Sequence, residues 1–173
     1  HPGQTAALAA FTPPQILASD LAGFALDLAH WGVADPGDLR FLDAVPHTTM
    51  EEAKALLTKL GALDGRGAMT PRGKLMRGLA LPPRLAAMVL AADEEGHGDQ
   101  AAMLAVLLTE QGLGGTDIDL DERLRRFTHE RTERATAARG LAKRLTASLG
   151  GPRSKGTAPE KTAGTARTAG QHL

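Results

Sequence analysis

Apolar residues recur at helical spacing near the start of the chain. Thr12-Pro13-Pro14-Gln15 is typical of a helix start, with a capping threonine, a proline in the first turn and an amide three residues after the cap. The apolar side chains that follow share one broad helical face, which we expect to be buried, and the helix should end at Gly32. These side chains are Ile16, Leu17, Leu21, Phe24, Leu28 and Trp31.

Two more helices are predicted before residue 61. The segment 35–38, with a proline and a glycine between two aspartates, is typical of the start of a short helix through Leu39 and Leu42. Thr48 or Thr49, followed at capping-box spacing by Glu51 or Glu52, predicts the start of a third helix. Its apolar positions continue to Leu60, and Gly61 should end it.

The pattern changes after Gly61. Asp64-Gly65 lies between two short apolar runs, which indicates a compact hairpin. Thr70-Pro71 then predicts the capped start of another short helix. Three helices followed by a tight hairpin are the elements of a winged helix.

The second half of the chain is predicted to be a small helix bundle. Leu81-Pro82-Pro83 favours a domain boundary, because the residue before a proline avoids helical geometry. Beyond it, one helix should run through residues 85–92 and a nearly all-apolar one through 102–108. A further helix begins near 120, and the apolar positions of 135–145 either extend it or form another.

Composition supports a helical fold and one polar tail. The 173 residues include four Phe, one Trp and no Tyr, so the core must be built from Leu, Ala, Met and Val, which suits packed helices. After Gly150 large apolar residues are missing until Leu173, and such a segment cannot bury enough surface to order itself. We therefore predict a mainly α chain: a degenerate winged helix with a small β-hairpin at 15–81, a small helix bundle at 82–149 and a disordered tail at 150–173.

The overall charge and the candidate motifs exclude several functions. Twenty basic and twenty acidic residues balance, so nucleic-acid binding would need a local basic patch, and the absence of cysteine fits a reducing compartment. No apolar stretch approaches the roughly 20 residues that span a bilayer. The chain also begins without methionine, and we expect it to be part of a longer polypeptide.

We predict no catalytic residue and no metal site within the chain. No phosphate-binding loop and no nucleophile elbow is present. Asp117 begins a run that suggests a calcium loop, but Glu122 replaces the required glycine and Thr128 the required glutamate, so acidic residues at a helix start are the better interpretation. The histidines lack metal-ligand spacing; they are His1, His30, His47, His97, His129 and His172.

One segment carries a basic excess, and its side chains are the candidate nucleic-acid contacts. They are Arg123, Arg125, Arg126, Arg131, Arg134, Arg139, Lys143 and Arg144. On one side of a helix, several of them would contact phosphates. Alternatively, they form surface pairs such as Glu130–Arg134 at four-residue spacing. Both interpretations stay open, and Arg66 and Arg84 are weaker candidates.

The third helix is not typical of a DNA-recognition helix. Its exposed positions should include Glu51, Glu52, Lys54, Thr58 and Lys59, which balance in charge and lack arginine. Major-groove recognition helices are rich in basic or amide side chains. We therefore expect the winged helix to serve in packing rather than in direct base reading.

Several blocks of the sequence resemble bacterial DEAH-box RNA helicases of the HrpB type. The resemblance covers roughly residues 1–149, and its most specific part runs from Leu60-Gly61-Ala62-Leu63-Asp64 to Leu81-Pro82-Pro83-Arg84. The other blocks are Thr12-Pro13-Pro14-Gln15-Ile16, Leu26-Asp27-Leu28-Ala29-His30-Trp31-Gly32, Asp35-Pro36 and Phe41-Leu42-Asp43.

The resemblance implies where this chain lies in a helicase and what it does there. In such helicases the winged helix braces two motor domains that bind and hydrolyse ATP with Mg²⁺, and a helical ratchet bundle helps to close the single-stranded RNA channel. Residues 1–14 would be the linker from the preceding motor domain. The implied partners are those motor domains and single-stranded RNA, held weakly through its backbone in the cytoplasm, with no cofactor bound by this chain itself.

Two other functions remain open. The chain could be a winged-helix nucleic-acid-binding regulator or a non-enzymatic protein-interaction module. It could also be a purely structural bundle whose arginines form only surface pairs. Binding to single-stranded RNA that weakens with salt would favour the helicase interpretation.

Overall fold

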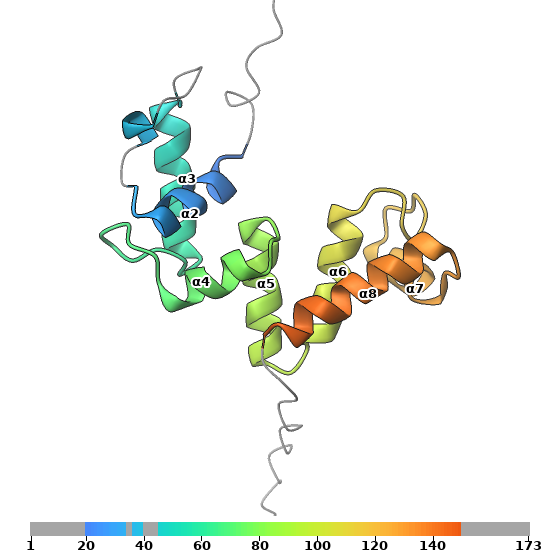
Figure 1. Cartoon of the computed structure of the whole chain (residues 1–173). Helices are drawn as coiled ribbons and strands as arrows, with labels where there is room; N and C mark the ends of the chain where they lie inside the picture. Colours follow the sequence, from blue (N-terminus) through green and yellow to red (C-terminus); the bar gives the residue numbers. More distant parts are fainter. Residues whose placement is uncertain (1–19, 34–35, 40–44, 150–173) are drawn as a thin grey trace, which may run out of the picture.

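The structure, a computed structural model, describes residues 20–33, 36–39 and 45–149 (Figure 1). The predicted helix start at Thr12, the linker 1–14, the side chains of Phe41 and Leu42, and the tail 150–173 lie outside the described residues. The described elements are α2 (Ala22–Trp31), the 3-10 turn η2 (Pro36–Asp38), α3 (His47–Lys59), α4 (Pro71–Gly78), α5 (Pro83–Glu94), α6 (Gly98–Thr109), α7 (Leu120–His129) and α8 (Glu133–Ala147). The prediction of a mainly α chain is confirmed.

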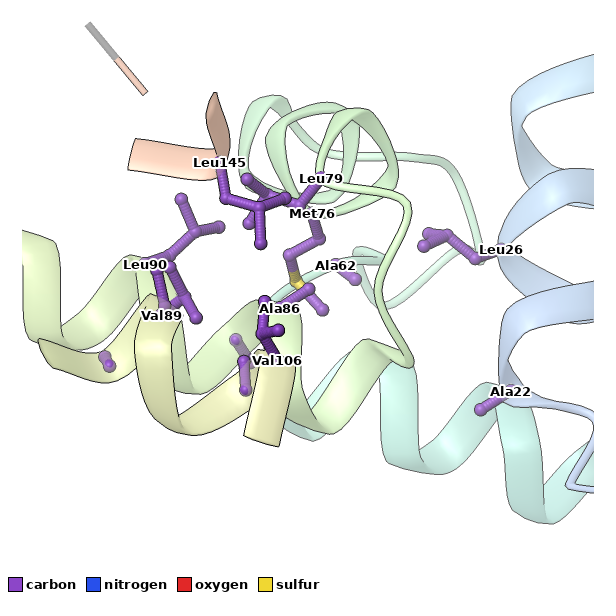
Figure 2. Packing of buried hydrophobic residues seen from close by; sticks show 14 of the residues in the cluster. Ala22, Leu26, Ala62, Met76, Leu79, Ala86, Val89, Leu90, Val106 and Leu145 are labelled. Carbon is purple, nitrogen blue, oxygen red and sulfur yellow. The ribbon is translucent and has the colours of Figure 1, made fainter. Parts of the chain in front are cut away.

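A single cluster of buried hydrophobic residues extends through both halves of the chain. In Figure 1, α2 and α3 lie on one side, α4 and α5 in the middle, and α6, α7 and α8 on the other. Figure 2 shows side chains from α4, α5, α6 and α8 gathered together, among them Met76, Ala86, Val106 and Leu145. The cluster consists of Leu, Ala, Met and Val with one aromatic residue, Phe127, as the composition predicts.

Helix α2 ends where predicted, and most of the described part of its predicted face is buried, since Leu21 and Leu28 are buried and Phe24 packs against the core. Gly32 adopts left-handed geometry with φ 75°, and its N–H donates to the carbonyl of Ala29. The prediction that Trp31 is buried is wrong, because its side chain is 61% exposed. Trp31 is the last residue of α2, one turn beyond the buried Leu28, so the helix ends before its side chain meets the core.

Helix α3 begins one to two residues before the predicted cap. Pro46 is the N-cap residue in extended geometry, no side chain caps the helix, and Met50 N–H donates to the Pro46 carbonyl at 3.0 Å. Thr48 and Thr49 therefore lie inside the first turn, and their predicted capping role is wrong. The helix end is as predicted, since Gly61 follows with φ 73°.

A tight turn connects α3 to α4. One antiparallel bridge joins Leu63 and Met69, and Asp64 N–H donates to the Ala68 carbonyl at 2.9 Å. No longer strand pairing occurs in the described residues, so the two-stranded hairpin of a winged helix stays a prediction. The predicted cap of α4 is confirmed, because the Thr70 hydroxyl accepts a hydrogen bond from Gly73 N–H at 2.9 Å.

The turn lies directly against α4 at a glycine. A Cβ atom added to Gly73 would lie 2.2 Å from the carbonyl oxygen of Ala62, which is backbone and cannot rotate away. The Thr70 hydroxyl also donates to the carbonyl of Gly61 at 2.6 Å. These backbone contacts hold Gly61 and Ala62 close to the start of α4.

The second half contains four helices in sequence. Pro83 is the first residue of α5, but α4 and α5 contribute to the same buried cluster, and the proposed domain boundary between them stays a prediction. α7 and α8 are separate helices, so the second of the two alternatives for residues 120–145 is the correct one. The break is set by Thr132, whose hydroxyl accepts from Ala135 N–H at 3.1 Å and caps α8.

In the described part of the chain, no single helix is long and apolar enough to cross a membrane. The bent pair α4 and α5, whose axes meet at 108°, passes the same test of length and composition only when both helices are taken together.

Candidate nucleic-acid interface

The acidic run before α7 is a helix cap. The Asp119 carboxylate accepts hydrogen bonds from the N–H groups of Asp121 at 2.9 Å and Glu122 at 3.4 Å. The carboxylates also favour the positive end of the helix dipole. The interpretation of this run as a helix start is therefore confirmed. Among the described residues, no group of three His, Asp or Glu side chains could hold a metal ion.

Two of the candidate arginines on α7 are paired with nearby acids. Glu122 binds both Arg125, three residues later, and Arg126, four residues later, the second with Nε 2.7 Å from Oε1. Arg126 also lies 3.4 Å from the carboxylate of Asp117. The exposed pairs with Glu122 are of the local helical type, each of which contributes about 0.2–0.5 kcal/mol.

Two other candidates bind backbone carbonyls instead of facing solvent. Arg139 donates to the carbonyl of Phe127 at 2.8 Å, and its guanidinium lies 5.9 Å from the centre of that ring. Arg123 reaches the carbonyl of Leu113 at 3.5 Å, and its Nε is buried without a hydrogen-bond partner among the described residues. These arginines join α7 to α8 and to the preceding loop.

The predicted pair between Glu130 and Arg134 is wrong. Arg134 lies 3.7 Å from the carboxylate of Glu110 at the end of α6. Glu130 instead accepts hydrogen bonds from the hydroxyl of Thr132 at 2.8 Å and from Gly114 N–H at 3.3 Å. Four-residue spacing brings side chains together only within one helix, and Glu130 lies in the break between α7 and α8.

Three candidate cations remain uncommitted. Arg131, Lys143 and Arg144 are exposed, and their side chains make no ion pair or hydrogen bond with another residue in the described ranges. Arg131 precedes α8, and the other two lie near its end, so they mark both ends of a helix about 22 Å long. Pairing thus accounts for part of the basic excess, and phosphate contact stays a prediction for these three.

The weaker candidates, Arg84 and Arg66, lie near acidic residues. Arg84 lines a shallow hollow of about 190 Å³ together with Asp20 and Glu52. Arg66 lies at a groove of about 440 Å³ between α2, α3 and the turn, beside Asp64. Neither site concentrates positive charge.

Comparison with known proteins identifies the class. No protein-family profile matches the chain. It is 39% identical over 111 residues to the ATP-dependent RNA helicase HrpB of Escherichia coli K12, a match that covers 64% of this chain and 14% of HrpB. It is 32% identical over 126 residues to the ATP-dependent RNA helicase HrpA of the same organism, covering 68% of this chain and 10% of HrpA.

Solved structures agree with the sequence comparison. A crystal structure of the E. coli DExH-box NTPase HrpB matches 84% of this chain and 18% of that chain, with a TM-score of 0.66 at 33% identity. A crystal structure of the Escherichia coli DEAH/RHA helicase HrpB matches 86% and 18%, with a TM-score of 0.68 at 33% identity. The chain is therefore homologous to a region of DEAH-box RNA helicases.

Within that class, the chain is related to the HrpB type, as the sequence blocks indicate. It spans 14% of the curated HrpB that it matches, so it corresponds to a small part of such a helicase.

Proposed function

We propose that this chain is an accessory region of an ATP-dependent RNA helicase of the HrpB type, which braces the motor domains and lines part of the path of single-stranded RNA. The observation that carries the proposal is the match to HrpB over most of the chain, in both sequence and fold. In this proposal α2, α3, α4 and the bridged turn form the degenerate winged helix, and the helices from α5 to α8 form the ratchet bundle.

The chemistry of the proposed helicase belongs to its motor domains. They would bind and hydrolyse ATP with Mg²⁺ in the cytoplasm, and this chain would transmit and guide the resulting movement. We expect the purified chain to show no ATP turnover with or without RNA. Turnover above background that survives a further purification step would contradict this assignment.

The RNA contacts in this proposal are made by uncommitted cations. The side chains of Arg131, Lys143 and Arg144 have no partner in the described part of the chain, so binding phosphate would not require breaking an existing ion pair. Exposed, unpaired cations bind the RNA backbone without choosing a base. The arginines that hold α7 and α8 together would instead shape the surface on which these cations lie.

The test compares two triple variants of equal charge. Arg131→Gln/Lys143→Gln/Arg144→Gln removes the uncommitted cations, and Arg125→Gln/Arg126→Gln/Arg134→Gln removes cations that already pair with acids. The affinity for single-stranded oligouridine is measured by fluorescence anisotropy at several salt concentrations. The first variant should lower the slope of log affinity against log salt by about 0.7 for each phosphate that it no longer binds.

The second variant should retain most of the affinity and of the salt dependence. Equal reductions in both variants would show that only overall charge matters. A reduction confined to the second variant would place the RNA contacts on α7 instead, and no binding by the unmodified chain at low salt would contradict an RNA path on this region.

A further inference from the structure

The only tryptophan of the chain projects from the surface of α2. Trp31 is 61% exposed, whereas Ala22, Ala25 and Leu26 of the same helix are buried. Leaving a large indole in water forfeits the hydrophobic stabilisation that its burial would provide. The fold of the described residues does not require the indole at this position, which makes it a candidate for contact with something outside the chain.

The side of α2 that carries Trp31 combines aromatic side chains with one ion pair. Phe24, seven residues earlier, lies on the same side, half-buried against the core, so an aromatic surface continues from the core edge to Trp31. Gly32 follows directly, and apart from its two neighbours in the chain no atom lies within 4 Å of the place where a Cβ would stand. Another backbone could therefore approach closely beside the indole.

The charge on this side of α2 is already neutralised. Asp27, one helical turn before Trp31, accepts a hydrogen bond from Arg77 of α4 at 2.8 Å. An aromatic side chain that stacks on RNA bases normally lies among cations that are free to bind phosphate. Here the cation that contacts the face is bound to a carboxylate, which favours an apolar protein partner over RNA.

We propose that the face formed by Phe24, Trp31 and the Asp27–Arg77 pair, here the α2 face, docks on another part of the helicase polypeptide, with Trp31 inserted in an apolar pocket. The inference rests on the proposed function and identifies the surface through which the chain would brace the motor. The homologous HrpB is much longer than this chain, because the match spans only 14% of it. The remaining polypeptide offers a large surface on which the α2 face could dock. Tryptophan is also among the residues that dominate binding energy at protein interfaces.

The single tryptophan provides a direct probe. The chain is labelled with 5-fluorotryptophan, so Trp31 gives one ¹⁹F signal, and unlabelled E. coli HrpB lacking the region that matches this chain is added. The signal should shift, broaden and lose its solvent isotope effect as the indole leaves water. Single-stranded oligouridine should leave the signal unchanged.

Variants test the contribution of the indole. Trp31→Ala should weaken binding to the truncated HrpB at least roughly tenfold, as expected for an interface residue of this kind. Leu108→Ala is the matched control, because Leu108 is also an exposed large hydrophobic residue but lies on α6 in the other half. The control should bind as the unmodified chain does.

The inference fails if the chain does not bind truncated HrpB, or if it binds and the Trp31 signal does not change. It also fails if oligouridine shifts the signal, or if the shift depends only on the concentration of the chain. The last two would indicate RNA stacking and self-association, respectively. If the Trp31 signal is unchanged while the three uncommitted cations are still needed for RNA binding, this inference fails and the proposed function stands.

Discussion

The two halves of the chain treat their aromatic residues in opposite ways. In the second half, Phe127 is completely buried, and Arg139 covers its ring and binds its carbonyl. In the first half, Trp31 is the most exposed of the described aromatic residues. The second half thus uses Phe127 for its own stability, whereas the first half packs Phe24 against the core and leaves Trp31 available for contact.

The charged residues differ in the same way. In the first half, Arg77–Asp27 joins α4 to α2, and Arg72–Glu94 joins α4 to α5 of the second half. In the second half, Arg125 and Arg126 of α7 bind Glu122 within their own helix, Arg139 binds a carbonyl at the α7–α8 junction, and only the longer Arg134–Glu110 pair joins distant elements among the described residues. A basic segment is therefore not by itself a binding surface, because much of its charge serves the local fold.

The largest predicted effect is on the free energy of unfolding, and it distinguishes Phe127 from Trp31. Phe127→Ala removes a fully buried ring and should lower the free energy of unfolding by about 3–5 kcal/mol. Trp31→Ala should change it by no more than about 0.5 kcal/mol, because the indole is mostly exposed. Urea unfolding followed by circular dichroism measures both, and a cost at Trp31 close to that at Phe127 would refute the contrast.

The next effect concerns the close approach of the turn to α4. Gly73→Ala places a Cβ against the backbone of Ala62 and should destabilise the chain by about 1–3 kcal/mol, since the carbonyl must move. Gly78→Ala is the control on the same helix, where nothing lies within 4 Å, and should be neutral or stabilise by up to about 1 kcal/mol. Thermal unfolding distinguishes them; equal stabilities would mean that the turn does not lie on α4 as described.

Gly114 provides the corresponding test in the second half. Its φ is +66°, and an added Cβ would lie 2.2 Å from the carbonyl oxygen of Arg123. Gly114→Ala should therefore destabilise the chain by about 1–3 kcal/mol, through both backbone strain and overlap. The same unfolding measurement applies, and unchanged stability would show that the loop before α7 does not approach Arg123 so closely.

The smallest effect compares two cations of α8. Arg139→Gln removes the hydrogen bond to the Phe127 carbonyl and the interaction with its ring, at a cost of about 1 kcal/mol. Lys143→Gln should not measurably change stability, because the Lys143 side chain has no partner among the described residues, but it should weaken RNA binding. The opposite result, reduced stability at Lys143 and reduced RNA binding at Arg139, would reverse the assignment of the two residues.

Local signals predicted the helix ends well. Gly32 and Gly61 both adopt the left-handed geometry expected after a helix, and Thr70 caps α4 through its hydroxyl. The threonines of α3 were misleading, because a proline immediately before the helix fixes its start without a side-chain cap. The predicted pair of Glu130 and Arg134 failed because the helix breaks between them.

The sequence by itself determined the helical class, most helix ends and the kinship with HrpB-type helicases. These features depend on near neighbours along the chain, such as apolar spacing, capping residues and short motifs. Only the tertiary structure decided which arginines are already bound and that Trp31 lies in water. Partners such as Glu110 for Arg134 and Arg77 for Asp27 come from distant positions, and no local pattern encodes which helices meet.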